Sequence, residues 1–126
     1  MATMNGIDIS AWQSGIDISK LTTTEFVIVK ATGGTGYTNP YFAKHMEAAI
    51  AAGKCVGAYH FARESGCKGT AKAEAAYFVG KVKAYIGKAI LVLDWETDLS
   101  LGVSWALEWL NEVYSLTGVK PLIYTG

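Results

Sequence analysis

Short apolar runs alternate with longer helical segments along this chain of 126 residues, and that alternation constrains the fold more than any other feature. Continuous apolar runs rich in β-branched residues are typical of strands that are buried on both faces, as in parallel sheets. The expected strands are residues 6–9, 26–31, 56–61, 89–95 and 122–124. Since strands that alternate with crossover segments build a parallel sheet, the sequence predicts an α/β fold with about five parallel strands.

Three clear crossover helices are expected between the later strands. They cover residues 39–52, 70–86 and 104–116, whereas the first link, residues 12–25, is only weakly helical. Asn39-Pro40 and Thr70 are typical of helix starts, and a glycine follows each helix. On the second helix, the residues expected to share one apolar face are Ala76, Tyr77, Val79, Val82 and Ile86.

The spacing of the strands also indicates how much of a β/α barrel a chain of this length can form. Successive strands start about 29 residues apart on average, so eight such units need about 230 residues, and a whole eightfold β/α barrel typically has about 250. We therefore expect a partial, TIM-like barrel in one domain, residues 1–126, that is incomplete at its C-terminal side. Exposed sheet edges must be covered, and we expect a second copy of the chain or further residues to cover this one.

Charge and composition argue against several classes of protein. The formal net charge is zero, from 11 Lys+Arg and 11 Asp+Glu, and no basic cluster is present, which argues against nucleic-acid binding. No apolar run approaches the roughly 18 residues of a membrane span. The first residues lack the features of a secretory signal, so we expect synthesis in the cytoplasm without an export signal.

Cys55 and Cys67 flank an extended segment that keeps them apart, and both are expected to be free thiols.

Acidic residues stand at the carboxyl ends of two expected strands, where ligands and catalytic groups collect in parallel sheets. Asp8 lies near the end of the first strand, and Asp94-Trp95-Glu96 ends the fourth. Because side chains two apart point to the same face, Asp94 and Glu96 are expected to project together. Crowding raises the pKa of at least one carboxyl, which places a protonated acid beside an ionised carboxylate, as glycoside hydrolysis requires. The alternative is that these acids cap turns or face water.

Aromatic residues near the same strand ends have two interpretations. Tyr59 and Tyr124 either line the mouth of the sheet or pack within it. Trp12 and Trp95 either stack on a sugar ring or belong to the core.

Other polar features favour structural roles. Residues 33–36, Gly-Gly-Thr-Gly, follow a strand as a phosphate-binding loop does, but they lack a following Gly-Lys-Ser/Thr and do not match G-x-G-x-x-G, so a turn is favoured. His45 is expected at the surface and His60 to be a structural histidine within a strand. No spacing of His, Cys and Asp predicts a metal site.

Five segments together resemble glycoside hydrolase family 25 lysozymes, many of which are phage endolysins or bacterial and fungal muramidases. The segments are Gly6-Ile7-Asp8-Ile9-Ser10 with Trp12-Gln13; Phe26-Val27-Ile28-Val29-Lys30-Ala31-Thr32; Ala52-Gly53 with Gly57-Ala58-Tyr59-His60-Phe61-Ala62; Leu91-Val92-Leu93-Asp94-Trp95-Glu96; and Thr117-Gly118 with Pro121-Leu122-Ile123-Tyr124-Thr125. The resemblance covers the whole chain in the right order.

The resemblance implies cleavage of the β-1,4 bond between N-acetylmuramic acid and N-acetylglucosamine in peptidoglycan. No cofactor is expected. By position, Glu96 is then the general acid, and Asp94 supports the oxocarbenium charge or orients the substrate's acetamido group. Asp8 completes the acidic cluster and Tyr59 lines the site. The expected partners are peptidoglycan glycan strands, and the expected place of action is the bacterial cell wall, reached during phage lysis or by non-classical release.

Two departures from the family pattern keep alternatives open. Gly34 stands where the family usually has a Glu, so one acidic residue is missing, and family domains usually continue beyond Tyr124 with the last strands and a further active-site Asp. One alternative is an inactive or truncated remnant that only binds cell-wall glycan. Another, a small nucleotide-binding domain, depends on the glycine segment alone.

Overall fold

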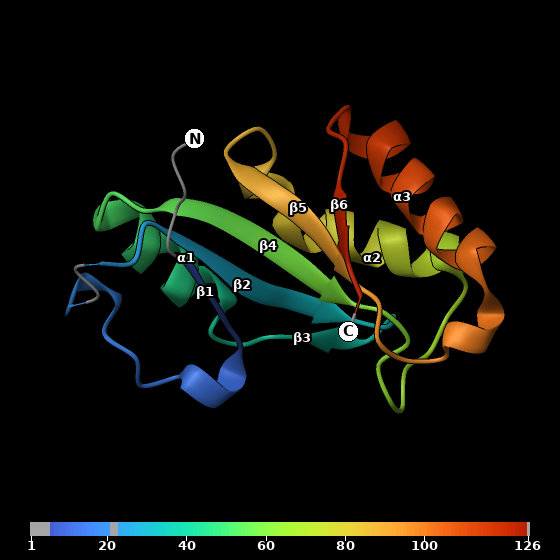
Figure 1. The fold of residues 1–126 in the computed structure, drawn as a ribbon, viewed down its shortest axis with the longest axis horizontal. Helices are drawn as coiled ribbons and strands as arrows, with labels where there is room; N and C mark the ends of the chain where they lie inside the picture. Colours follow the sequence, from blue (N-terminus) through green and yellow to red (C-terminus); the bar gives the residue numbers. More distant parts are fainter. Residues whose placement is uncertain (1–5, 21–22, 126) are drawn as a thin grey trace.

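The chain folds around a parallel sheet, seen in a computed structural model that describes residues 6–20 and 23–125 (Figure 1). The parallel strands, in their order across the sheet, are β1 (Gly6–Ile9), β2 (Phe26–Gly33), β4 (Cys55–Phe61), β5 (Ala89–Asp94) and β6 (Leu122–Tyr124). The predicted α/β fold with five parallel strands is confirmed. The expectation about a secretory signal concerns residues 1–5, which lie outside the described residues.

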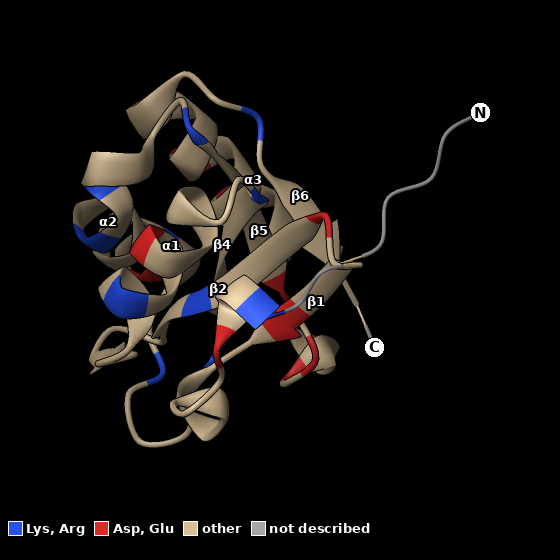
Figure 2. Cartoon of the chain, turned by 90° about the vertical axis from the view of Figure 1, so that its left-hand side faces the viewer, with Lys and Arg blue, Asp and Glu red and all other residues tan. Residues whose placement is uncertain are grey.

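The three α-helices lie on one side of this sheet (Figures 1 and 2). The three α-helices are α1 (Phe42–Ala51), α2 (Ala71–Val82) and α3 (Val103–Thr117), and they connect the strands as the predicted crossovers do. The 3-10 helices are η1 (Ala11–Gln13), η2 (Ile18–Lys20), η3 (Lys83–Tyr85) and η4 (Leu99–Leu101). The first two lie in the weakly helical link between β1 and β2. None of the helices in the described part of the chain is long and apolar enough to cross a bilayer.

Helix α1 begins at Phe42, later than the predicted start at Asn39-Pro40. Asn39 is buried, and its side-chain amide donates a hydrogen bond to the carbonyl of Lys30 at 2.8 Å. Its side-chain oxygen accepts a hydrogen bond from the backbone N–H of Tyr41 at 3.0 Å. Asn39 therefore closes a turn that is tied to β2, and the helix starts only after that turn.

The glycine segment forms the turn of a β-hairpin. Strand β3 (Tyr37–Thr38), which the sequence did not predict, pairs antiparallel with the end of β2. Gly34 has φ +54°, and a Cβ on it would lie 2.3 Å from the carbonyl oxygen of Cys67. Only glycine fits there without rearrangement. The turn interpretation is confirmed, and the segment does not open a helix as a phosphate-binding loop does.

Helix α2 is shorter than predicted, and the apolar face predicted for it is correct only in part, since Val79 and Val82 are buried. It ends at Val82, where the 3-10 helix η3 takes over. Ala76, expected on the apolar face, is exposed. The buried side chains of α2 are Ala71, Glu74, Ala75, Phe78, Val79 and Val82. Residues two apart on a helix are about 200° apart around its axis, so a face that buries Phe78 turns Ala76 outward.

His45 is buried at 1% exposure, which makes the prediction of a surface histidine wrong. It lies on the face of α1 that also carries Phe42, Met46 and Ala49, all of them buried. The helical position therefore decides its burial more than its polarity does. Burial, with the charge of Lys44 as a smaller cause, lowers the pKa of His45 and favours the neutral ring.

Alternation along the strands separates a packed face of the sheet from an open one. Val27, Val29 and Ala31 are fully buried, whereas Ile28 and Lys30 between them point to the opposite face and are partly exposed. At the two edges of the described sheet, β1 pairs only with β2 and β6 only with β5. The side chains that point away from the helices therefore lie on the open face of the sheet.

Cys55 and Cys67 are both free thiols, as predicted.

Candidate active site

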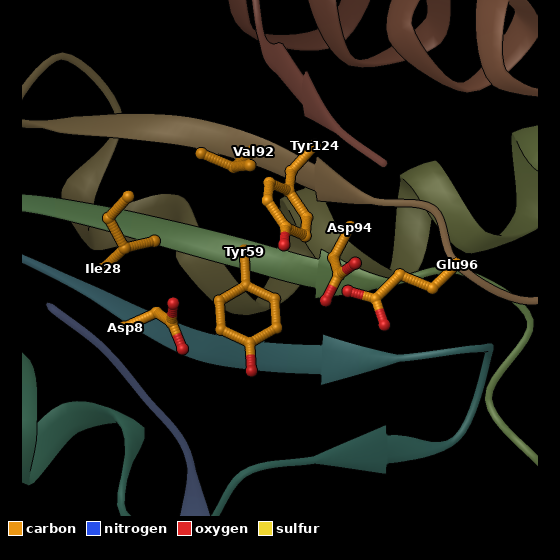
Figure 3. A pocket seen from close by; sticks show the side chains of 7 residues that line it. All are labelled: Asp8, Ile28, Tyr59, Val92, Asp94, Glu96 and Tyr124. Carbon is orange, nitrogen blue, oxygen red and sulfur yellow. The ribbon is translucent and has the colours of Figure 1, made fainter. Parts of the chain in front are cut away.

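A pocket opens on the helix-free face, near the carboxyl ends of the parallel strands (Figure 3). Its lining residues are Asp8, Ile28, Tyr59, Val92, Asp94, Glu96 and Tyr124. Parallel register brings them together, because Asp8 is paired with Ile28 across β1 and β2. In the same way Asp94 is paired with Tyr124 across β5 and β6. Five of the seven site residues considered from the sequence therefore line one pocket.

The three carboxyl groups come from β1, from the end of β5 and from the loop that follows β5. Asp94 ends β5, and Glu96 follows it in the next loop with its carboxyl turned toward that of Asp94 (Figure 3). Asp8 lies on the other side of Tyr59 in the same view. Acidic segments stand close to β1, on the side of the sheet away from the helices (Figure 2). The pocket is thus an acidic mouth with an aromatic ring at its centre.

The Asp94 carboxyl holds its proton far more strongly than an ordinary aspartate does. Burial raises the pKa of Asp94 to about 7, assisted by a hydrogen bond with the Glu96 carboxyl and by the charges of Glu96 and Asp8. The Lys30 ammonium acts in the opposite direction. Near neutral pH the Asp94–Glu96 pair therefore carries a proton beside a negative charge.

Tyr59 keeps its phenolic proton in this surrounding. Burial raises the pKa of Tyr59 above its ordinary value, and the negative charges of Asp94, Asp8 and Glu96 raise it further. The hydroxyl is therefore a hydrogen-bond donor throughout the range in which the carboxyls titrate.

The two tryptophans considered from the sequence do not line this pocket. Trp95 is 6% exposed and belongs to the core, whereas Asp94 before it and Glu96 after it line the pocket. Trp12 is 91% exposed and lines a separate, open hollow, which it shares with Lys30, Tyr37 and other residues. Its helix η1 is anchored by a capping box between Ser10 and Gln13.

An ion pair beside the pocket was not singled out from the sequence. The Lys30 ammonium lies 2.7 Å from a carboxylate oxygen of Glu64. Lys30 shares the pleat of Ile28, so alternation along β2 was a signal that could have placed it on the site face. Glu64 lies in the loop after β4, and nothing in the local sequence pattern indicates that it reaches β2.

His60 has the structural role that the sequence predicted. Its ring is fully buried, with Nδ1 2.7 Å from the Thr32 hydroxyl and Nε2 2.8 Å from Glu74 Oε1. Burial lowers the pKa of His60, while the bond to Glu74 opposes that shift. Glu74 also accepts backbone hydrogen bonds from Arg63 and Gly69. The pair therefore secures the loop after β4 from the helix side of the sheet.

No group of three or more His, Cys, Asp or Glu side chains suited to a metal ion occurs within residues 6–20 and 23–125.

Comparisons with known proteins agree with this geometry. The model of the family described as glycosyl hydrolases family 25 matches residues 7–126. The N,O-diacetylmuramidase of Chalaropsis sp. is 33% identical over 141 residues, which cover 98% of this chain and 66% of that protein. A family GH25 lysozyme structure from Aspergillus fumigatus has a TM-score of 0.86 at 30% identity, over 98% of this chain and 66% of that one. The catalytic domain of endolysin ply40, from bacteriophage P40 of Listeria monocytogenes, has a TM-score of 0.82 at 28% identity, over 100% of this chain and 65% of that one.

The matched structures also show which part of a larger fold the sheet of this chain corresponds to. The parallel strands and helices of this chain superpose on part of the barrel-like fold of those lysozymes, in agreement with the predicted partial barrel. The chain spans 66% of the length of the Chalaropsis muramidase and 48% of another curated relative. The whole-chain family match, the shared fold and the acidic mouth lead to one conclusion: this chain belongs to glycosyl hydrolases family 25.

Proposed function

We propose that the chain acts as a peptidoglycan hydrolase that cleaves the β-1,4 bond between N-acetylmuramic acid and N-acetylglucosamine. The observation that carries the proposal is the Asp94–Glu96 pair, which holds a proton at neutral pH and shares its pocket with Asp8. Glycoside hydrolysis needs one carboxyl that donates a proton and one that is ionised. Family membership and a relative named as a muramidase support the same reaction.

In this mechanism Glu96 delivers the proton to the leaving oxygen. Its side chain is exposed, whereas Asp94 is partly buried, so Glu96 is the member of the pair that a glycan can reach more freely. Asp94 stores the shared proton, and once ionised it supports the oxocarbenium charge or orients the substrate's acetamido group. Asp8 adds negative charge across the mouth, and its carboxylate favours the positive transition state.

The aromatic residues are proposed to hold the sugar. Tyr59 presents a protonated hydroxyl at the centre of the pocket, and Tyr124 lines it from β6. Trp12 is exposed above a neighbouring hollow, and we assign to it the stacking role against a sugar ring. Trp95 is buried, and in the proposal it supports the strand that carries Asp94.

Residues 1–126 are proposed to be the N-terminal portion of a catalytic domain, with the bacterial cell wall as its place of action. Leu122, Ile123 and Tyr124 of the β6 edge are all exposed. We propose that further chain or a second copy covers this edge, because an open apolar strand favours pairing. Sedimentation of the purified chain at several concentrations tests for a second copy, and a monomer with full lytic activity contradicts both forms of the proposal.

The decisive experiment incubates the purified chain with a cell-wall suspension and measures turbidity and new reducing ends. We expect both signals, and we expect Glu96→Gln to abolish them. Glu108→Gln is the matched control, because it removes the charge of an exposed glutamate on α3, which does not line the pocket. If the chain sediments with cell walls but releases no reducing ends, the alternative of a remnant that only binds glycan replaces the hydrolase.

A further inference from the structure

Lys30 lies beside the acidic pocket, and its ammonium is held on several sides. Its Nζ atom lies 2.7 Å from Glu64 Oε1, and both side chains are largely shielded from solvent, with exposures of 14% and 22%. The same atom lies 4.7 Å from the ring centroid of Tyr37 and 4.9 Å from that of Phe61. Such cation–π contacts are strongest where water is excluded. Lys30 is therefore fixed in place by one carboxylate and two rings.

The backbone beside Glu64 is shaped to admit its carboxylate. A Cβ atom on Gly33 would lie 2.5 Å from Glu64 Oε1 and 2.9 Å from Glu64 Cβ and Cδ. Any side chain at position 33 therefore forces Glu64 to move. Since Gly33 ends β2 without a positive φ, its lack of a side chain matters here for space rather than for backbone conformation.

Lys30 pairs with Glu64 and not with the carboxyls of the pocket. Among the described residues it forms no ion pair with Asp94, Asp8 or Glu96. We propose that Glu64, in the space left by Gly33, is a positioning residue that keeps the Lys30 ammonium from pairing directly with Asp94. The inference rests on the proposed function, in which the Asp94–Glu96 pair supplies the proton.

The charges around Asp94 decide the sign of this effect. Glu96 in the next loop and Asp8 on β1 favour its protonated form, and Lys30 on β2 favours its ionised form. Tyr124 on β6 and Tyr59 on β4 line the same pocket, and Tyr59 keeps its phenolic proton. Lys30 already favours the ionised form of Asp94, and without the Glu64 carboxylate beside it the positive charge of the ammonium is no longer compensated. Such a change favours ionisation, so the proton that the pair needs is lost at a lower pH.

Three variants separate this role from a purely structural one. Glu64→Gln keeps the shape of the side chain and removes its charge, and Gly33→Ala leaves the charge but pushes the carboxylate from its place. Lys30→Met keeps an apolar stem against the two rings and removes the cation. The matched control is Glu108→Gln, which removes one exposed carboxylate on α3.

The test follows the side-chain carboxyl carbon of Asp94 by NMR during a pH titration, with Asp94→Asn used to assign the signal. We expect Glu64→Gln to lower the Asp94 midpoint by about 0.5–1 pH unit, and Gly33→Ala to lower it by less. Lys30→Met is expected to raise the midpoint, and Glu108→Gln to leave it unchanged.

The inference is overturned if Glu64→Gln and Gly33→Ala both leave the Asp94 midpoint unchanged while the rest of the spectrum stays native. A structural role alone lowers stability without moving the midpoint, so urea unfolding of the same variants is measured in parallel. The NMR titration does not depend on cell-wall hydrolysis. A chain that releases no reducing ends therefore contradicts the proposed function, and the effect of Glu64 on the titration of Asp94 can still be measured.

Discussion

Asp94 and Glu96 turn their carboxyl groups toward each other at the end of β5, although Trp95 between them points into the core (Figure 3). The pleat of a strand sends alternate side chains to opposite faces, so this short segment supplies both an acidic pair and a buried anchor. The backbone N–H of Trp95 donates to the carbonyl of Tyr124 at 2.9 Å, which secures the pair to the neighbouring strand.

The stability of the fold is expected to depend on the proton of Asp94. The pKa of Asp94 is raised to about 7 in the folded chain. The stability that comes from its protonated carboxyl is therefore fully present below the pKa of Asp94 in the unfolded chain, and it is lost as pH rises through 7. Asp94→Asn has no ionisable carboxyl at this position, so the variant does not lose this stability as pH rises. We expect it to raise the free energy of unfolding by about 1–2 kcal/mol at pH 8, allowing for partial solvent exposure, and to change it little at pH 4. Urea unfolding at the two pH values measures the difference, and an equal effect at both contradicts the assignment.

Hydrolysis of cell walls is expected to decline as the acidic pair loses its proton. The release of reducing ends is therefore expected to fall through a midpoint near pH 7, the value to which the pKa of Asp94 is raised. Initial rates measured from pH 4 to pH 9 at constant ionic strength give the profile. A rate that stays level up to pH 9 excludes this pair as the proton donor.

Glu74→Ala is expected to destabilise the chain strongly. The substitution leaves the His60 ring and the backbone N–H groups of Arg63 and Gly69 without their buried acceptor. Loss of one partner in a buried network of this kind costs about 3–5 kcal/mol. The control, Glu108→Ala, removes an exposed side chain on α3 and is expected to cost less than about 0.5 kcal/mol. Similar urea midpoints for the two variants contradict the structural role of Glu74.

Alanine is expected to have opposite effects at two glycines. Gly34→Ala places a Cβ against the Cys67 carbonyl at a positive φ, which we expect to cost about 2 kcal/mol or more. Gly80→Ala lies on an exposed position of α2 with nothing within 4 Å of the added atom. There alanine stabilises the helix by about 0.5–1 kcal/mol. Thermal melts of both variants give the comparison, and a Gly34→Ala chain as stable as the parent chain refutes the steric argument.

Trp12→Ala tests the proposed sugar-stacking residue. The side chain is 91% exposed, so its loss is expected to leave the melting temperature within about 2 °C of the parent chain. If Trp12 stacks on the glycan, the loss weakens substrate binding by about 1–2 kcal/mol, which corresponds to roughly a tenfold rise in KM for soluble glycan fragments. Trp12→Phe retains an aromatic face and is expected to recover most of that loss. An unchanged KM in the alanine variant removes Trp12 from the site.

Much of the fold could be predicted because its signals are local. The five strands follow from continuous apolar runs, and Thr70 caps α2 through its hydroxyl as its position indicated. The acidic pair followed from the period of a strand, since residues two apart share a face whatever the rest of the chain does. Asp8 could be added because parallel strands end at a common edge.

Tertiary structure decided what depends on residues distant in sequence. His45 is buried because of the sheet against which α1 packs, and its own polarity gave the opposite expectation. Trp12 and Trp95 look equivalent in the sequence, but one is exposed beside a hollow and the other is core. Glu64 reaches Lys30 across 34 positions of the chain, and only the folded loop shows that Gly33 leaves it the space. The sequence alone determined the order of the parallel strands and the α-helices and the face on which the acids lie, because both depend on local periodicity. Burial, ion pairing and the raised pKa of Asp94 depend on which surfaces meet, and only the packed structure contains that information.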